Sequence, residues 1–157
     1  MVNKKNCLRM LGILVMVLVF GMTVVGCASL FGKKAPESFT QGSGGDTTIL
    51  LRQGLDPDQA FREIIFILNR HGFQPEMMYP EAGFLRTRWN TTWTTLKSGS
   101  TERYRVSVIV QFNPNRTQVI IQAPAEFSTD GGTVWVEGYD RRAIETLRND
   151  ITMAIGN

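Results

Sequence analysis

Cysteine is scarce in this sequence. The chain of 157 residues has two cysteines, Cys7 and Cys27, and none in the 130 residues that follow Cys27. Small exported domains that depend on disulfides carry several cysteines each. The sequence therefore excludes a disulfide framework in its C-terminal part, and it raises the question of why a single cysteine is kept at position 27.

Histidine is almost absent too, and the usual signatures of catalysis are missing. The single histidine is His71, so a transition-metal site would need an unusual number of carboxylates. The sequence has no G-x-S-x-G motif, no phosphate loop and no evident set of serine, histidine and aspartate. We therefore predict that the protein is not an enzyme and needs no cofactor and no metal.

Charge is missing from Met10 to Gly32, a stretch that begins almost entirely apolar. The nine residues before it carry Lys4, Lys5 and Arg9 and no acidic residue. A positive start, an apolar run and small residues before a break are typical of an export signal. The sequence therefore predicts that the chain leaves the cytoplasm.

The end of this apolar run, Val24-Val25-Gly26-Cys27, resembles the lipobox of bacterial lipoproteins. The resemblance implies that the Cys27 thiol is alkylated with diacylglycerol and that the signal is cut after Gly26. It also implies that the new amino terminus carries a fatty acid such as palmitate. The mature chain would then have no free thiol, which explains the single cysteine at position 27.

The alternative is a membrane-spanning anchor, because about 23 uncharged residues are long enough to cross a bilayer. Both interpretations place the C-terminal part outside the cytoplasm, since the flank rich in lysine and arginine stays inside. Position 28 is Ala28 rather than aspartate, and an aspartate there resembles an inner-membrane retention signal. We therefore expect a lipid anchor in the outer membrane, with the protein facing the periplasm.

The excess of basic over acidic residues in the whole chain comes from the signal peptide. The formal net charge is +3, from 17 basic and 14 acidic residues, and three of the basic residues lie before Gly26. The mature chain is therefore neutral, which argues against binding of nucleic acid through overall charge. We expect three segments: a signal peptide at 1–26, a lipidated flexible tether at 27–46 and a single domain at 47–157.

Two helices are predicted in this domain. Asp56 is suited to cap the first helix, Pro57 to its first position, and Gln59 would complete a capping box. The helix is expected to end at His71, followed by Gly72 as the residue after the cap. A cationic histidine at the end of a helix is favoured by the helix dipole. A second helix is predicted from about 140 to 155, and a short strand at 47–54 precedes the first helix.

Between the helices, alternating residues predict an antiparallel hairpin of residues 83–93 and 102–112, joined by the loop 97–100. The turn Asn113–Arg116 then returns the chain into a third strand, with Phe112 opposite Thr117. The segment 133–138 is of uncertain type. One register of the hairpin places the large apolar residues on one face: it pairs Trp93 with Tyr104, Trp89 with Val108 and Leu85 with Phe112.

The predicted fold class is α+β, helix-grip-like, with an antiparallel sheet of three to five strands packed on one face by two helices. The helix 56–73, the strands 83–93 and 103–112 and the terminal helix resemble the helix-grip domains of the BamC family of outer-membrane assembly lipoproteins. The resemblance implies a protein-binding accessory in outer-membrane protein assembly, with the barrel-assembly machinery among its envelope partners.

Four arginines, Arg86, Arg88, Arg103 and Arg105, are predicted on the solvent face of the sheet. They are interpreted either as a solvated face that resists edge aggregation or as a docking surface for an acidic partner or lipid headgroups. An alternative function is binding of a lipid or small apolar ligand in a cleft between sheet and helix. That hypothesis predicts a dry pocket beneath Trp89 and Val108.

Overall fold

The structure is a computed structural model, and it describes residues 35–95 and 101–157. The predictions for the signal peptide, for Cys27, for the tether up to residue 34 and for the loop 97–100 fall outside the described residues. The segment Ala35–Asn157 forms one compact unit, and the description that follows concerns that unit.

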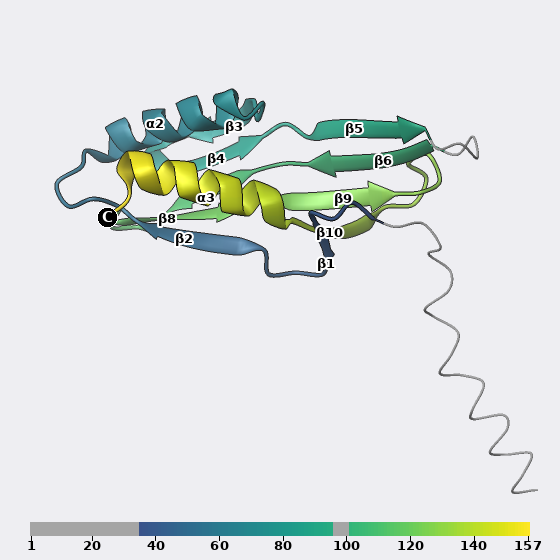
Figure 1. Cartoon of the computed structure of the whole chain (residues 1–157). Helices are drawn as coiled ribbons and strands as arrows, with labels where there is room; N and C mark the ends of the chain where they lie inside the picture. Colours follow the sequence, from purple (N-terminus) through teal and green to yellow (C-terminus); the bar gives the residue numbers. More distant parts are fainter. Residues whose placement is uncertain (1–34, 96–100) are drawn as a thin grey trace, which may run out of the picture. The chain divides into compact units, whose positions relative to one another are not determined.

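Ten strands form two antiparallel five-stranded sheets (Figure 1). The first sheet has the order β1-β10-β9-β6-β5 and the second the order β2-β8-β7-β4-β3. The helices of the unit are α2 (Pro57–Arg70), α3 (Arg141–Ile155) and a 3-10 turn, η1 (Pro80–Ala82). The strands are β1 (Phe39–Gln41), β2 (Asp46–Leu50), β3 (Pro75–Tyr79), β4 (Phe84–Thr87), β5 (Asn90–Thr95), β6 (Thr101–Val106), β7 (Ile109–Phe112), β8 (Gln118–Gln122), β9 (Pro124–Ser128) and β10 (Val136–Asp140).

Three stretches of chain run through both sheets and bend where they pass from one to the other. β4 leads into β5, β6 into β7, and β8 into β9, with one or two residues between the strands of each pair. At the bend the Thr87 hydroxyl accepts the Val108 N–H at 2.8 Å and donates to the Arg88 carbonyl at 3.2 Å. The Ser107 hydroxyl donates to the Thr87 carbonyl at 2.9 Å. Both side chains are fully buried, so they replace ladder hydrogen bonds where no water can do so.

Helix α2 begins as the sequence predicts. The Asp56 side chain accepts the Asp58 N–H, and Pro57 occupies the first position. His71 is the C-cap residue, and Gly72 follows with φ of +79°, a conformation that favours glycine. His71 Nε2 lies 2.7 Å from Asp150 Oδ2 of α3. This contact, followed by the one from Arg70, lowers the pKa of Asp150, so the carboxylate links the two helices.

Helix α3 is capped by Asp140, a nearly buried residue at the end of β10. Its carboxylate accepts the Ala143 N–H at 2.8 Å, the Tyr104 hydroxyl at 2.6 Å and the Ser38 hydroxyl at 3.0 Å. Burial raises the pKa of the Tyr104 hydroxyl, and its hydrogen bond to Asp140 raises it further. Tyr104 therefore stays protonated and ties the start of α3 to the sheet.

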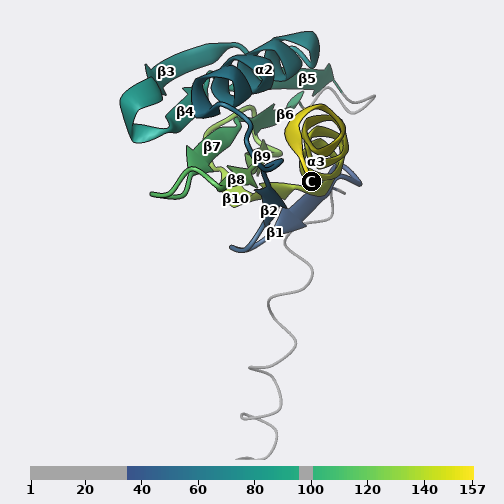
Figure 2. The same ribbon diagram turned by 90° about the vertical axis from the view of Figure 1, so that its left-hand side faces the viewer.

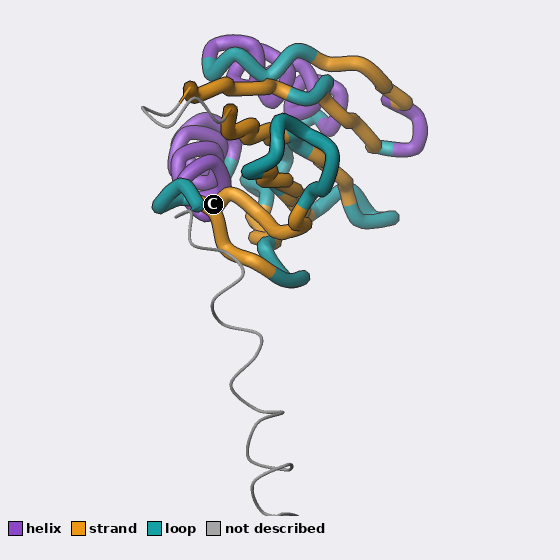
Figure 3. Tube along the Cα trace, turned by 90° about the vertical axis from the view of Figure 1, so that its right-hand side faces the viewer, coloured by secondary structure: helices purple, strands orange, loops and turns teal. Residues whose placement is uncertain are grey.

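Both helices lie on the same side of the strands, as the two end-on views show (Figures 2 and 3). They enclose one hydrophobic core, to which each sheet contributes alternate residues. Among its fully buried members are Ile64 and Leu68 of α2, Val110 and Ile121 of the strands, and Leu147 of α3. Neither described helix has both the length and the hydropathy needed to cross a membrane.

Strand β1 lies within the segment predicted as tether, so the tether prediction does not hold for residues 39–41. The Phe39 ring meets the Tyr104 ring edge-on, with 6.1 Å between the ring centres, and it packs near the Phe127 ring. β1 pairs with β10 from Phe39↔Asp140 to Gln41↔Gly138. A side chain at Gly138 would come within 2.2 Å of the Thr40 carbonyl, so glycine is what permits this close approach.

The α+β class and the packing of two helices on antiparallel strands are confirmed. The strand at 47–54, both helices and the turn at Asn113–Arg116 are also found near their predicted positions. The sequence analysis missed β3 and β9, and it left the type of β10 open. As a result it predicted one sheet, where the structure has two that share long bent strands.

The predicted registers of both hairpins are wrong. Trp93 pairs with Arg103 rather than Tyr104, and Leu85 pairs with Val110 rather than Phe112. Between these two pairs the first strand has one residue more than its partner, which reverses its alternation. After the third-strand turn, Phe112 pairs with Val119 rather than Thr117, because the turn is longer than predicted. That second shift is of two residues and leaves the faces unchanged.

Replacing Thr87 by valine should cost about 1–3 kcal/mol of unfolding free energy, because the Val108 N–H would stay buried without an acceptor. Valine keeps the shape of threonine, so packing should change little. The measurement is equilibrium urea unfolding of the full chain. The matched control is Thr48→Val, on an exposed position of β2, which should change the unfolding free energy by less than about 0.5 kcal/mol. Equal stability of the two variants would contradict the assigned role of the bend.

Candidate functional site

All three tryptophans of the chain lie outside the hydrophobic core. The sequence analysis placed Trp89 and Trp93 on the core face, which is wrong. The extra residue at the bend turns β5 over, so Trp93 shares its face with Arg103 and is 58% exposed. Trp89 is partly exposed, as is Trp135 before β10. We call the side of the sheets that carries these residues the Trp–Arg face; its members are Trp89, Trp93, Trp135, Arg86, Arg103 and Arg105.

Arg105 holds the centre of the Trp–Arg face. Its guanidinium carbon lies 4.8 Å from the centre of the Trp89 ring and 4.2 Å from that of Trp135. Arg105 Nε also donates to the Glu126 carboxylate at 2.8 Å, and a second guanidinium nitrogen contacts the same oxygen. The planar guanidinium thus combines cation–π contacts with an ion pair. These contacts fix the two indole rings relative to the sheet.

The turn before Trp135 is fixed by Asp130. Its carboxylate accepts the Ser128 hydroxyl at 2.6 Å and the N–H groups of Thr133 and Val134 at 3.0 Å each. The Ser128 hydrogen bond, followed by the backbone ones, lowers the pKa of Asp130. The carboxylate therefore stabilises this glycine-rich turn, from which the chain continues into Trp135.

Arg103 lies on Trp93, with its guanidinium carbon 3.8 Å from the ring centre. A side chain at Gly132 would come within 2.8 Å of this guanidinium, so the turn packs closely on the arginine. The Nε atoms of Arg103 and Arg86 are buried and have no hydrogen-bond partner among the described residues. Such unsatisfied donors are uncommon in native structures.

An open groove of about 840 Å³ runs beside these residues, on the side of the sheets opposite the helices. Trp89, Trp135 and Ile109 give it apolar walls, while Arg86 and Glu137 supply charge. The loop between β1 and β2 borders the groove and also lines a smaller hollow of about 210 Å³. Gly42 in this loop has φ of +109°, a conformation that favours glycine.

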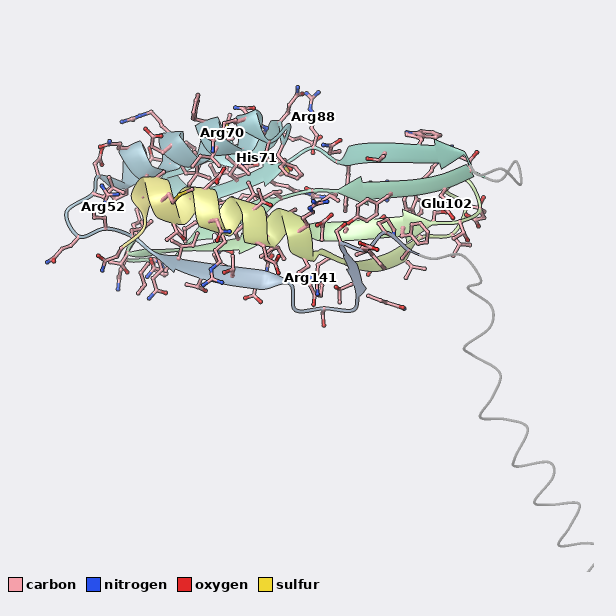
Figure 4. All side chains as sticks on the ribbon, viewed as in Figure 1. Arg52, Arg70, His71, Arg88, Glu102 and Arg141 are labelled. Carbon is pink, nitrogen blue, oxygen red and sulfur yellow. The ribbon has the colours of Figure 1, made fainter. Side chains whose placement is uncertain are left out.

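Arg88 does not belong to the Trp–Arg face, although the sequence analysis grouped it with the other three arginines. It sits at the bend, where its N–H donates to the Gln74 carbonyl at 2.9 Å before β3. Figure 4 shows its exposed side chain projecting outward. The structure therefore brings together Arg86, Arg103 and Arg105 and leaves Arg88 apart.

Trp89 and Val108 lie on opposite sides of the sheets, so the pocket expected beneath both of them is not found in the part of the chain that the structure describes. Val108 is fully buried in the core, whereas Trp89 lines the outer groove. The sequence analysis missed Trp135 and Glu137 as site residues, because it left the segment around them unassigned. The signal that could have identified Trp135 is its place directly after a glycine-rich turn. Among the described residues, no three histidine, cysteine or acidic side chains lie close enough to hold a metal ion.

Comparison with known proteins adds no relative. No protein-family model matches the sequence, and a search of curated proteins finds no significant match.

Replacing Arg105 by lysine should lower the unfolding free energy by about 1 kcal/mol, because lysine cannot pair in a fork or stack flat on the indoles. It should also shift tryptophan emission to longer wavelength as Trp89 and Trp135 gain contact with water. Urea unfolding and the emission spectrum measure the two effects. Arg88→Lys is the control and should change neither; an unchanged spectrum in Arg105→Lys would contradict the stacking.

Proposed function

We propose that this protein is a non-enzymatic lipoprotein of the bacterial cell envelope that acts by binding other envelope proteins. Its anchor is the acylated Cys27, in the outer membrane and facing the periplasm. The resemblance of its helices and strands to the BamC family supports an accessory role in outer-membrane protein assembly. The binding site is the Trp–Arg face together with the groove beside it.

The position of all three tryptophans on this face is the observation that carries the proposal. Tryptophan and arginine are enriched among the residues that dominate protein–protein binding. Fixing their side chains in advance lowers the entropy lost on binding, and Arg105 does this for Trp89 and Trp135. The face also combines aromatic side chains with arginine, and both are enriched at protein interfaces.

A second candidate is binding of a small apolar ligand, and one observation favours it. The groove has a volume within the range of about 300–1,000 Å³ that is common for ligand sites, and two indole rings line it. The ligand would then occupy the outer groove rather than the space between helices and sheet. It would change the emission of Trp89 and Trp135 on binding.

The anchor is tested by acylation at Cys27. The full chain, expressed in a bacterium that has an outer membrane, should incorporate labelled palmitate and lose residues 1–26. Cys27→Ser should lose the label and keep the size of the precursor, whereas Cys7→Ser should behave like the unaltered chain. An unlabelled chain of full length would indicate a membrane-spanning anchor instead.

The binding site is tested by a matched pair of charge reversals, Arg86→Glu and Arg88→Glu, in the full chain. Cells are cross-linked, the tagged chain is recovered from membranes, and co-purifying proteins are quantified against an unrelated lipoprotein. Arg86→Glu should reduce recovery of the partner about tenfold, which corresponds to about 1.4 kcal/mol. Arg88→Glu should leave it unchanged, because Arg88 lies outside the face.

Recovery of barrel-assembly subunits would support the assembly role. Equal recovery with both variants would place the binding site elsewhere. Since Arg86 is partly buried, Glu137→Lys on the exposed wall of the groove serves as a second variant whose effect does not depend on Arg86. If no protein is enriched but phospholipid accompanies the chain and fatty acids change its emission, the second candidate replaces the first.

A further inference from the structure

Four strands form the outer edges of the two sheets: β1, β2, β3 and β5. Three of them are protected in ways that limit pairing with another strand. β1 has three residues, and β3 begins with Pro75 and has a register break at Glu76. The outer side of β2 meets the end of the chain, where Asn157 N–H donates to the Leu50 carbonyl and Leu51 bridges to Gly156.

β5 has none of these protections. It spans the six residues Asn90–Thr95 and pairs with β6 without a register break. It contains no proline and no charged residue, and the side chains of Thr91, Thr92 and Trp93 are exposed. Within the described part of the chain, nothing pairs with its outer edge; Figure 1 shows β5 at the margin of its sheet. The outward N–H and C=O groups of such a strand can pair with another strand.

The sequence of β5 fits a second copy of itself. Residues 91–95 read Thr-Thr-Trp-Thr-Thr, which is symmetric about Trp93. In an antiparallel pair with a two-fold axis at Trp93, each tryptophan faces its own image and every threonine faces a threonine. Aromatic–aromatic and Thr–Thr pairs are favourable across antiparallel strands, and no like charges meet. A two-fold axis also makes the contact closed and self-complementary.

We propose that two copies of this chain associate through β5, edge to edge and antiparallel, with Trp93 opposite Trp93. The pairing joins two five-stranded sheets into one ten-stranded sheet and covers a tryptophan that is 58% exposed in the single chain. The inference does not rest on the proposed function, because it is argued from the edge of β5 and not from the groove; Trp93 belongs both to this edge and to the Trp–Arg face.

Cysteine cross-linking in membranes tests both the contact and its register. In the full chain carrying Trp93→Cys, the two cysteines lie opposite each other, with Cβ atoms about 4.5–5.5 Å apart, close to the separation of a disulfide. In Thr91→Cys the two cysteines are offset by four residues, which is a distance of about 14 Å along the strand. Oxidation with copper phenanthroline should therefore link Trp93→Cys into a dimer and leave Thr91→Cys a monomer on a non-reducing gel.

A charge variant keeps the test independent of the new thiol. Trp93→Lys places two ammonium groups opposite each other and removes the aromatic pair, so it should raise the dimer dissociation constant at least about tenfold. Gln111→Lys, exposed on β7, is the control and should not change it. Sedimentation equilibrium of the purified full chain in detergent gives the constant, and circular dichroism confirms that the variants are folded.

Three results would overturn the proposal. One is equal cross-linking of Trp93→Cys and Thr91→Cys, which would indicate random collision. The second is a folded, monomeric unaltered chain at all concentrations. The third is cross-linking of Trp93→Cys to a different protein, which would show that the edge receives a strand from a partner. Loss of partner recovery in Glu137→Lys, on the wall of the groove, with an unchanged dimer would separate this contact from the proposed binding site.

Discussion

The fold depends on the hydrogen bonds at the bend shared by the long strands. A buried strand cannot leave its ladder without leaving N–H and C=O groups unpaired, and such groups destabilise the native state. Thr87 and Ser107 provide the replacement bonds with their own hydroxyls. These bonds join two of the three stretches that change sheets, β4–β5 and β6–β7, at their bends. Two helices on one side can then cover residues from both sheets.

The bend also explains where the sequence could predict the structure and where it could not. Tyr104, Val106, Val108 and Val110 keep one alternation through both sheets, so their face was predictable. The extra residue at the bend in the neighbouring strand has no mark in the sequence, because neither Arg88 nor Trp89 is a bulge signal. The pattern therefore placed Trp89 and Trp93 in the core. The helices were predictable because Asp56, Pro57 and Gly72 act locally.

A shift of one residue in the alternation of this strand therefore decides whether its tryptophan lies in the core or on the surface. The candidate site follows from this shift. With β5 turned over, the sheet presents Trp93 and Arg103 beside the stack around Arg105. Arg86, Arg103 and Arg105 were predictable as surface residues by alternation alone. Trp135 was not, since its position depends on the Asp130 turn and on the pairing of β10 with β9, both long-range features of the folded chain.

The early start of the folded unit has a mechanical consequence. With the acyl anchor proposed at Cys27, eleven residues lie between the anchor and β1, a contour length of at most about 40 Å. Tension on that anchor would reach the domain first through a three-residue strand on a sheet edge, which can detach from β10 one pair at a time. Its detachment would remove Phe39 from Tyr104 and Ser38 from Asp140. The same short segment would thus limit how far the domain reaches and yield first under load.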